Sequence, residues 1–245
     1  MANWFTYDWQ YEGEDAVFRA DLSLQPETQA EEYPFLFRLD CRAAKEEALT
    51  PRCLRHVDSM ERKFIKEDLL FAGRVDTPLC AQFYLYSRGK ETGAALEYIA
   101  EKEKRLLECR IDARDDADWS FYRRFLYPDV AKSQTEENRK LIDRIVKTGD
   151  NPAAARRIRL HLFFPSEPLA AMFAQQARTA GFALAESEFI PEMETPHGVV
   201  IVRVCTLQKR EVDAMTTQAI RLAAPCQGIM CYWECPRIPK NSPLR

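Results

Sequence analysis

Apolar and polar residues alternate most clearly in the second half of the chain. Every second residue of 158–164 is apolar, which is the period of a β-strand, and Pro165 ends the run. Apolar residues then recur at helical spacing from Leu169 to Ala180, and Gly181 follows at the position after the last helical turn. The later patterns predict strands at 182–189 and 199–205, a helix over 212–222, and a last strand at 229–235.

This order of strand, helix, strand, strand, helix, strand is that of the split β-α-β unit of a ferredoxin-like fold. Right-handed crossovers place both helices on one face of an antiparallel sheet. If the helices cover the face that carries Ile158 and Leu160, then Arg159 and His161 lie on the other face.

The first half repeats the same order behind two additional strands. The predicted elements are strands at 4–11, 16–22 and 35–39, a helix after Pro51 that includes Ile65, strands at 69–75 and 82–86, a helix over 95–106, and a strand at 108–113. We therefore predict an α+β protein of two tandem ferredoxin-like domains with antiparallel sheets, residues 1–131 and 132–245.

A connecting helix is predicted at the start of the second domain. Ser133 and Glu136 have the spacing of a capping box, and an apolar side follows over 141–146. The Gly-Asp-Asn-Pro sequence at 149–152 ends this helix. A short helix over 119–126 precedes it.

Charge is distributed unevenly between the two halves. Residues 1–131 hold 19 Lys and Arg against 26 Asp and Glu, a net charge of −7, whereas residues 132–245 hold 16 against 12, a net charge of +4. Neither value is extreme enough to identify a nucleic-acid-binding protein. No run approaches the roughly 18 apolar residues of a membrane helix, and no export signal is recognisable, so we expect a cytoplasmic protein.

Several classes of enzyme are disfavoured by the absence of their motifs. The sequence has no G-x-S-x-G, no phosphate-binding loop and no H-E-x-x-H, and its eight glycines offer little material for a nucleotide cradle. In a reducing cytoplasm the cysteines are interpreted as small buried hydrophobic residues, and we expect no metal and no cofactor. The eight are Cys41, Cys53, Cys80, Cys109, Cys205, Cys226, Cys231 and Cys235.

The candidate functional residues lie on two strands of the second domain. His161 is either a titratable centre of a binding surface or a half-buried histidine at a domain interface. Trp233, beside Tyr232, is either an anchor for a partner protein or a core residue. Arg157, Arg159, Phe163 and Arg203 could form a basic, aromatic sheet face that binds single-stranded RNA, although no RNP1-like string occurs.

Several strings in the second half resemble a known family. The segment 157–164, with a basic residue, His and Phe in its strand, is similar to the opening strand of the regulator of ribonuclease activity B family. Gly149-Asp150, Gly181-Phe182 and the closing Trp233-Glu234 resemble further family motifs, and Gly228 can be aligned with the closing signature. At 230–232 Met, Cys and Tyr stand where the family has Tyr, Asp and Gly. The resemblance spans about residues 140–238.

The first half resembles a bacterial domain of unknown function that is often fused to that family. The resemblance depends on Trp9, Ala72-Gly73-Arg74, Phe83-Tyr84-Leu85-Tyr86, Asp118-Trp119-Ser120-Phe121-Tyr122 and Leu126-Tyr127-Pro128. These motifs imply no established activity.

The resemblance implies a non-catalytic regulator that binds ribonuclease E and inhibits its action on RNA, with a ferredoxin-like fold. Carried over to this sequence, it implies partner contacts at His161, Trp233 and Glu234, to which Arg159 is added because it lies on the same strand face as His161. An immunity protein that neutralises a toxin nuclease is an alternative, because an acidic first half would steer a basic toxin. A single-stranded RNA-binding module and a small enzyme are the remaining hypotheses.

Overall fold

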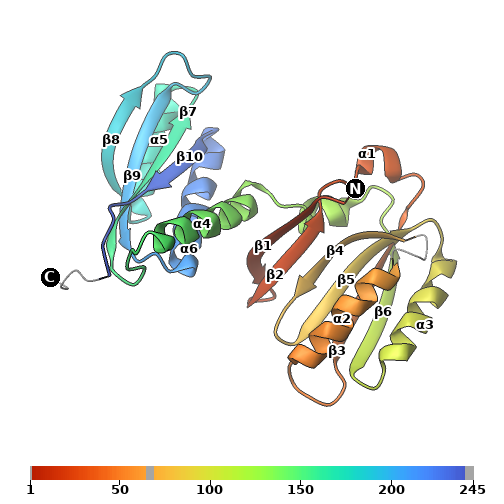
Figure 1. Cartoon of the computed structure of the whole chain (residues 1–245). Helices are drawn as coiled ribbons and strands as arrows, with labels where there is room; N and C mark the ends of the chain where they lie inside the picture. The colour runs from red at the N-terminus through yellow and green to blue at the C-terminus, as the bar shows by residue number, and fades with distance from the viewer. Residues whose placement is uncertain (1, 65–68, 241–245) are drawn as a thin grey trace. The chain divides into compact units, whose positions relative to one another are not determined.

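The computed structural model of the chain describes residues 2–64 and 69–240 (Figure 1). The chain divides into two compact units, residues 1–128 and 129–245. Ile65, which the sequence pattern assigned to a helix, lies outside the described residues, as do the last five residues of the predicted second domain. In the described ranges no helix combines the length and the apolar character needed to cross a bilayer.

The first unit is built on a six-stranded antiparallel sheet with the strand order β1-β2-β4-β5-β3-β6. Within it, β4-β5-β3-β6 and helices α2 and α3 follow the predicted β-α-β-β-α-β order, and the β1–β2 hairpin extends the sheet beside β4. The elements are β1 (Trp4–Tyr11), β2 (Glu14–Asp21), α1 (Pro26–Gln29), β3 (Phe35–Ala43), α2 (Pro51–Phe64), β4 (Leu70–Asp76), β5 (Cys80–Ser87), α3 (Gly93–Glu103) and β6 (Leu107–Asp115).

Both faces of this sheet are covered, and its central strand β5 is buried at every position. Helices α2 and α3 cover one face and enclose a core that includes Leu39, Val57 and Phe83. An aromatic layer that includes Trp119 and Tyr122 covers the other face. The predicted short helix at 119–126 is present here as a wide turn of π type over Tyr122–Leu126. Unit 1 is therefore a sheet between two apolar layers.

The second unit has a four-stranded antiparallel sheet with the strand order β10-β7-β9-β8. Alternate residues of β7, among them Ile158 and Leu160, pack against α5 and α6 on one face, and the apolar side of α4 joins the same core. The α+β class with antiparallel sheets is thus confirmed. The elements are α4 (Val130–Lys147), β7 (Arg156–Phe164), α5 (Glu167–Thr179), β8 (Ala183–Phe189), β9 (His197–Cys205), α6 (Lys209–Ala223) and β10 (Ile229–Glu234).

Helix α4 begins earlier than the sequence pattern indicated. Its N-cap is Asp129, whose carboxylate accepts a hydrogen bond from the backbone nitrogen of Lys132 at 2.8 Å. The capping box predicted at Ser133 and Glu136 is wrong, because both residues already lie inside the helix. Asp129 is the cap because it directly follows Pro128 and its backbone is extended, so that its carboxylate reaches a free amide of the first turn.

Replacing Asp129 with alanine should therefore destabilise the second unit by about 1 kcal/mol, since one amide of the first turn loses its acceptor. Urea denaturation followed by far-UV circular dichroism measures the loss, and hydrogen exchange of α4 peptides locates it. The matched variant Ser133→Ala is expected to leave the free energy of unfolding within about 0.5 kcal/mol. A larger loss of unfolding free energy in Ser133→Ala than in Asp129→Ala would show that Ser133, and not Asp129, caps the helix.

Candidate protein-binding face

Within residues 129–240, one face of the sheet of unit 2 is covered by no helix. We call it the open face, and it is formed by side chains from all four strands. Its members include Arg157, Arg159, His161, Phe163, Ala183, Glu186, Glu188, Val200, Val202, Val204, Ile229, Tyr232 and Glu234. They alternate along each strand with the residues that face α5 and α6, as the period of a strand requires.

A cluster of charged side chains occupies the middle of the open face. Arg159 Nη2 lies 2.8 Å from Glu186 Oε1, and Arg159 Nε lies 3.1 Å from Glu234 Oε1. The same Glu234 oxygen lies 3.3 Å from His161 Nε2. One arginine therefore connects β7 to the strands at both edges of the sheet, and its positive charge is shared between two carboxylates.

His161 lies beneath this cluster and is stacked on Tyr232. The two ring centroids are 4.2 Å apart and the planes are inclined by 14°. The histidine is 7% exposed, whereas Tyr232 is 50% exposed. Within 2–64 and 69–240, His161 Nδ1 has no hydrogen-bond partner. The stack thus presents an exposed aromatic ring on a buried, polar support.

The ion pairs of the cluster alter the acidity of its members. The hydrogen bond from Arg159, followed by its charge, holds the pKa of Glu186 below the ordinary value of 4.5. The same bond raises the pKa of Arg159. Both side chains are solvated, so the pairs set the geometry of the face more than its stability.

A shallow hollow of about 330 Å³ adjoins the cluster at one end of the open face. Arg157, Ala183, Val202 and Val204 line it from this face, and Gly181 and Arg203 complete its lining from the helix side. Val204 is 63% exposed, which is unusual for a β-branched residue in a regular strand. An exposed ring, paired charges and an apolar recess on one rigid sheet are the components from which protein interfaces are built.

Trp233 does not lie on the open face. It stands between Tyr232 and Glu234 in β10, so its side chain points to the opposite side, where it is 3% exposed in the core. Its indole Nε1 donates a hydrogen bond to Asn138 Oδ1 of α4 at 2.8 Å. A buried indole of this kind positions its strand and offers no surface to a partner.

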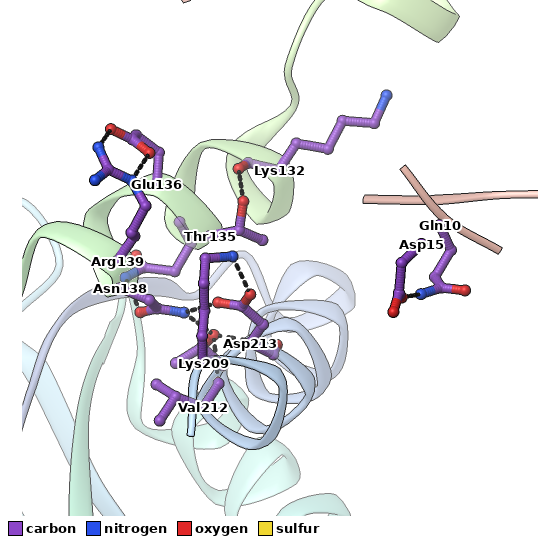
Figure 2. Close-up of polar contacts among 12 residues, drawn as sticks. Gln10, Asp15, Lys132, Thr135, Glu136, Asn138, Arg139, Lys209, Val212 and Asp213 are labelled. Carbon is purple, nitrogen blue, oxygen red and sulfur yellow. Dashed lines mark hydrogen bonds and ion pairs between the residues drawn. The ribbon is translucent and has the colours of Figure 1, made fainter. Parts of the chain in front are cut away.

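Asn138 is the centre of a buried polar network that joins α4 to α6 and β10. Its Nδ2 donates to Asp213 Oδ1 and to Thr216 Oγ1, each at 2.8 Å. Figure 2 shows Asn138 beside Asp213, which also receives Lys209 at 2.6 Å. Asn138 is fully buried, and these hydrogen bonds replace the ones that its amide makes to water in the unfolded chain.

The Gly149-Asp150 pair has a structural role. Asp150 and Arg156 form an ion pair at 2.8 Å in which both side chains are fully buried. Asp150 Oδ2 also accepts the backbone nitrogen of Ile238 at 2.8 Å, and Arg156 donates to the carbonyl of Pro236 at 3.2 Å. This pair holds the segment after β10 against the loop between α4 and β7.

The comparisons with known proteins agree with the two units. Residues 2–127 match the Family of unknown function (DUF695), and residues 135–235 match Regulator of ribonuclease activity B. The chain belongs to the first of these families and carries a match to the second in its C-terminal half. Among curated proteins, none matches the chain.

Twelve chains of solved structures match, and one of them aligns with most of this chain. It is the crystal structure of an unknown protein from Galdieria sulphuraria, with 11% identity and a TM-score of 0.24 over 84% of this chain and 99% of that one. A TM-score this low supports no conclusion about the fold or the function.

The motifs of the family of unknown function are explained by packing in unit 1. Gly73 lies in β4 where an added Cβ would come within 2.5 Å of the carbonyl oxygen of Arg19, so only glycine fits. Trp119 donates from Nε1 to the carbonyl of Tyr33 at 2.9 Å and stacks on Tyr86 at 4.1 Å. Tyr122 donates to the carbonyl of Asp21 at 2.7 Å. These residues close the aromatic layer.

The structure brings together three of the four residues that the sequence singled out for the regulator half, namely Arg159, His161 and Glu234. Sequence reasoning missed Glu186 and did not select Tyr232 as a site residue. Arg203, which was assigned to a basic face, is on the helix side instead, where it donates to Gln218 at 2.8 Å and to the carbonyl of Ala180 at 2.7 Å. Its register partner Ile158 faces the core, which explains the difference.

Replacing Trp233 with phenylalanine should lower the free energy of unfolding by about 0.5–1.5 kcal/mol, since Asn138 Oδ1 loses one of its two donors and keeps Gln134 Nε2 at 2.9 Å, while most of the apolar volume is kept. Urea denaturation followed by far-UV circular dichroism checks this. Tyr232→Phe on the neighbouring, exposed position is the matched variant and should change stability by less than about 0.5 kcal/mol. Equal stabilities for both variants would show that the indole hydrogen bond contributes nothing.

The side-chain carboxyl of Glu186 should titrate below 4.5 in a pH series followed by carboxyl carbon NMR. Because the folded-state pKa is lowered, the ion pair with Arg159 stabilises the protein at neutral pH, and this contribution is lost as the pH falls through the lowered pKa. Arg159→Gln should move the midpoint back upward. Arg157→Gln, which removes a neighbouring charge from the same strand face, should leave it nearly unchanged.

Proposed function

We propose that this chain is a non-catalytic regulator that binds an RNA-degrading enzyme of the ribonuclease E type through the open face of its C-terminal unit and inhibits it. The match of residues 135–235 to Regulator of ribonuclease activity B supports the regulatory role. The open face supports the mode of action, because it is a preformed surface with polar, aromatic and apolar parts. We expect the protein to act in the bacterial cytoplasm.

The inferred domains are ferredoxin-like in both halves. The supporting observation is the sheet order: β10-β7-β9-β8 in unit 2 and β6-β3-β5-β4 in unit 1 are each the fourth, first, third and second strand of a β-α-β-β-α-β sequence. We assign the regulator role to residues 132–245, with α4 as the connecting helix. Residues 1–131 form a domain to which no activity is assigned.

The single observation that carries the proposal is the cluster formed by Arg159, Glu186 and Glu234 around the His161–Tyr232 stack. Arginine and tyrosine are enriched among the residues that dominate binding energy at interfaces. Here both are held in place before a partner arrives, Arg159 by two carboxylates and Tyr232 by the imidazole. A preformed surface loses less side-chain entropy on binding.

Arg159, Glu234 and Tyr232 are the residues proposed to contact the partner protein directly. His161 and Trp233 act from beneath: His161 supports the ring of Tyr232, and Trp233 fixes the register of β10 through Asn138. The two roles separate experimentally, because loss of a contact weakens binding at constant stability, whereas loss of a support lowers both.

RNA is a less suitable ligand for this face. Of the four residues considered for it, Arg203 lies on the other side, Phe163 is 5% exposed and Arg159 is paired with two carboxylates. Arg157 remains as a solvated cation. Stacking and phosphate contacts of the kind that hold single strands need several exposed aromatic and basic residues together.

Calorimetric titration of the 245-residue chain with the C-terminal half of ribonuclease E from the same organism tests the proposal. We expect micromolar or tighter binding. Tyr232→Ala should weaken it at least tenfold, as expected for an anchor that contributes more than about 1.4 kcal/mol. Far-UV circular dichroism and thermal melting confirm that the variant is folded.

The matched control is Met172→Ala, which removes a 40%-exposed apolar side chain from α5 on the opposite side of unit 2. It should leave the affinity within twofold. No binding by the folded wild-type protein would overturn the proposal. Tight, salt-sensitive binding of single-stranded RNA in its place would favour the RNA-binding hypothesis, and capture of a basic toxin nuclease would favour the immunity protein.

A further inference from the structure

Two cysteines of unit 1 face each other across neighbouring strands. Cys41 of β3 is the direct register partner of Cys109 of β6, and the two sulfur atoms are 3.4 Å apart. Directly opposed residues of antiparallel strands have Cα atoms about 4.5–5.5 Å apart. A disulfide needs a Cα separation of about 4.4–6.8 Å. The backbone therefore already holds the two thiols where a disulfide can form.

The two thiols differ in their access to solvent. Cys41 is completely buried, whereas Cys109 is partly exposed on the edge strand β6. A small reagent can thus reach Cys109 first, because Cys41 is buried. This arrangement of an accessible thiol and a buried thiol in contact is that of an attacking cysteine and a resolving cysteine.

The hydrogen bond between the two thiols also favours Cys109 as the attacking cysteine. The bond from Cys41 lowers the pKa of the Cys109 thiol, although burial and the nearby Glu103 and Glu108 oppose the change. The same bond and burial raise the pKa of Cys41 well above its ordinary range. The thiolate, which is the reactive form, is therefore favoured at the accessible sulfur.

Cys53 in the same core has a different environment. Its thiol donates to the carbonyl of Leu106 at 3.7 Å and accepts from Thr50 Oγ1 at 3.3 Å, so its polar capacity is used by the chain. Cys53 therefore makes the hydrogen bonds expected of a structural cysteine. Cys41 and Cys109 bond to each other instead, which leaves them as a pair.

We propose that Cys41 and Cys109 are an oxidisable dithiol that a low-molecular-weight disulfide converts into a cross-strand disulfide. The Cys109 thiolate attacks one sulfur of the small disulfide and releases one equivalent of small thiol, which takes up the proton. Cys41 then loses its proton and attacks the Cys109 sulfur of the mixed disulfide, releasing a second equivalent. The protein loses two electrons and two protons, and the small disulfide gains them.

The bond is readily reversed by the opposite exchange. Excess small thiol attacks the more accessible Cys109 sulfur and regenerates the dithiol. In a reducing compartment the pair rests as thiols and closes only under oxidative load, as transient redox-sensing disulfides do. The closed form ties the edge strand β6 to β3, which restrains the end of the sheet.

The test uses the reduced 245-residue chain, with both units present, and oxidised glutathione as the probe. Because the exposed Cys231 can itself take up glutathione, intact mass is read on Cys231→Ser, where it should fall by about 2 Da. Non-reducing peptide mapping of the wild type should show Cys41 linked to Cys109. The linked form should melt at a higher temperature than the reduced form, and dithiothreitol should reverse both changes.

Two variants separate the roles of the sulfurs. Cys41→Ser should leave Cys109 as a stable mixed disulfide with glutathione, because no thiol remains to displace it. Cys109→Ser should leave Cys41 unmodified in the folded protein. Cys231→Ser, which removes the exposed cysteine of β10, is the control and should still form the linked peptide. Free Cys41 and Cys109 after oxidation of the folded wild type, or a mixed disulfide at Cys109 that is never displaced by Cys41, would overturn the proposal.

Discussion

The hydrogen bond between the indole of Trp233 and the buried amide of Asn138 decides which side of β10 faces outward. Neighbouring residues of a strand point to opposite faces. Once the indole is held in the core, Tyr232 and Glu234 must face away from the helices, where one stacks on His161 and the other binds Arg159. The arrangement of the open face therefore depends on the Trp233–Asn138 hydrogen bond, which lies on the core side of the sheet.

The two units use similar sheets in different ways. Unit 1 covers both faces of its sheet, one with α2 and α3 and the other with the aromatic layer closed by Trp119. In the described part of unit 2, helices cover one face only, and the other face carries a charged cluster and a hollow. A buried sheet holds a fold together, whereas an uncovered one offers a rigid binding surface. This difference is why the proposed interaction is assigned to the second unit.

Most elements were predictable from the sequence because periodicity is a local property, as in β7 and α5. Strand alternation sends the adjacent Trp233 and Glu234 to opposite faces, although the sequence analysis expected both to contact a partner. The role of Glu186 was not predictable. A bulge between Leu184 and Glu186 shifts the register of β8, so that Glu186 joins the open face instead of the core side. Bulges leave no clear trace in a single sequence. The start of α4 was also missed, because Asp129 and Ser133 are both chemically suitable N-caps and the sequence does not distinguish them.

The most direct test of the proposed interface is methyl NMR of the 245-residue chain while the C-terminal half of ribonuclease E is added. Val204 reports on the open face and Met172 on α5, and both side chains are exposed in the protein alone. The account predicts shifts or broadening at Val204, and at Val202 beside Arg159, with Met172 unchanged. Perturbation of Met172 with Val202 and Val204 unchanged would contradict it and move the interface to the helix side.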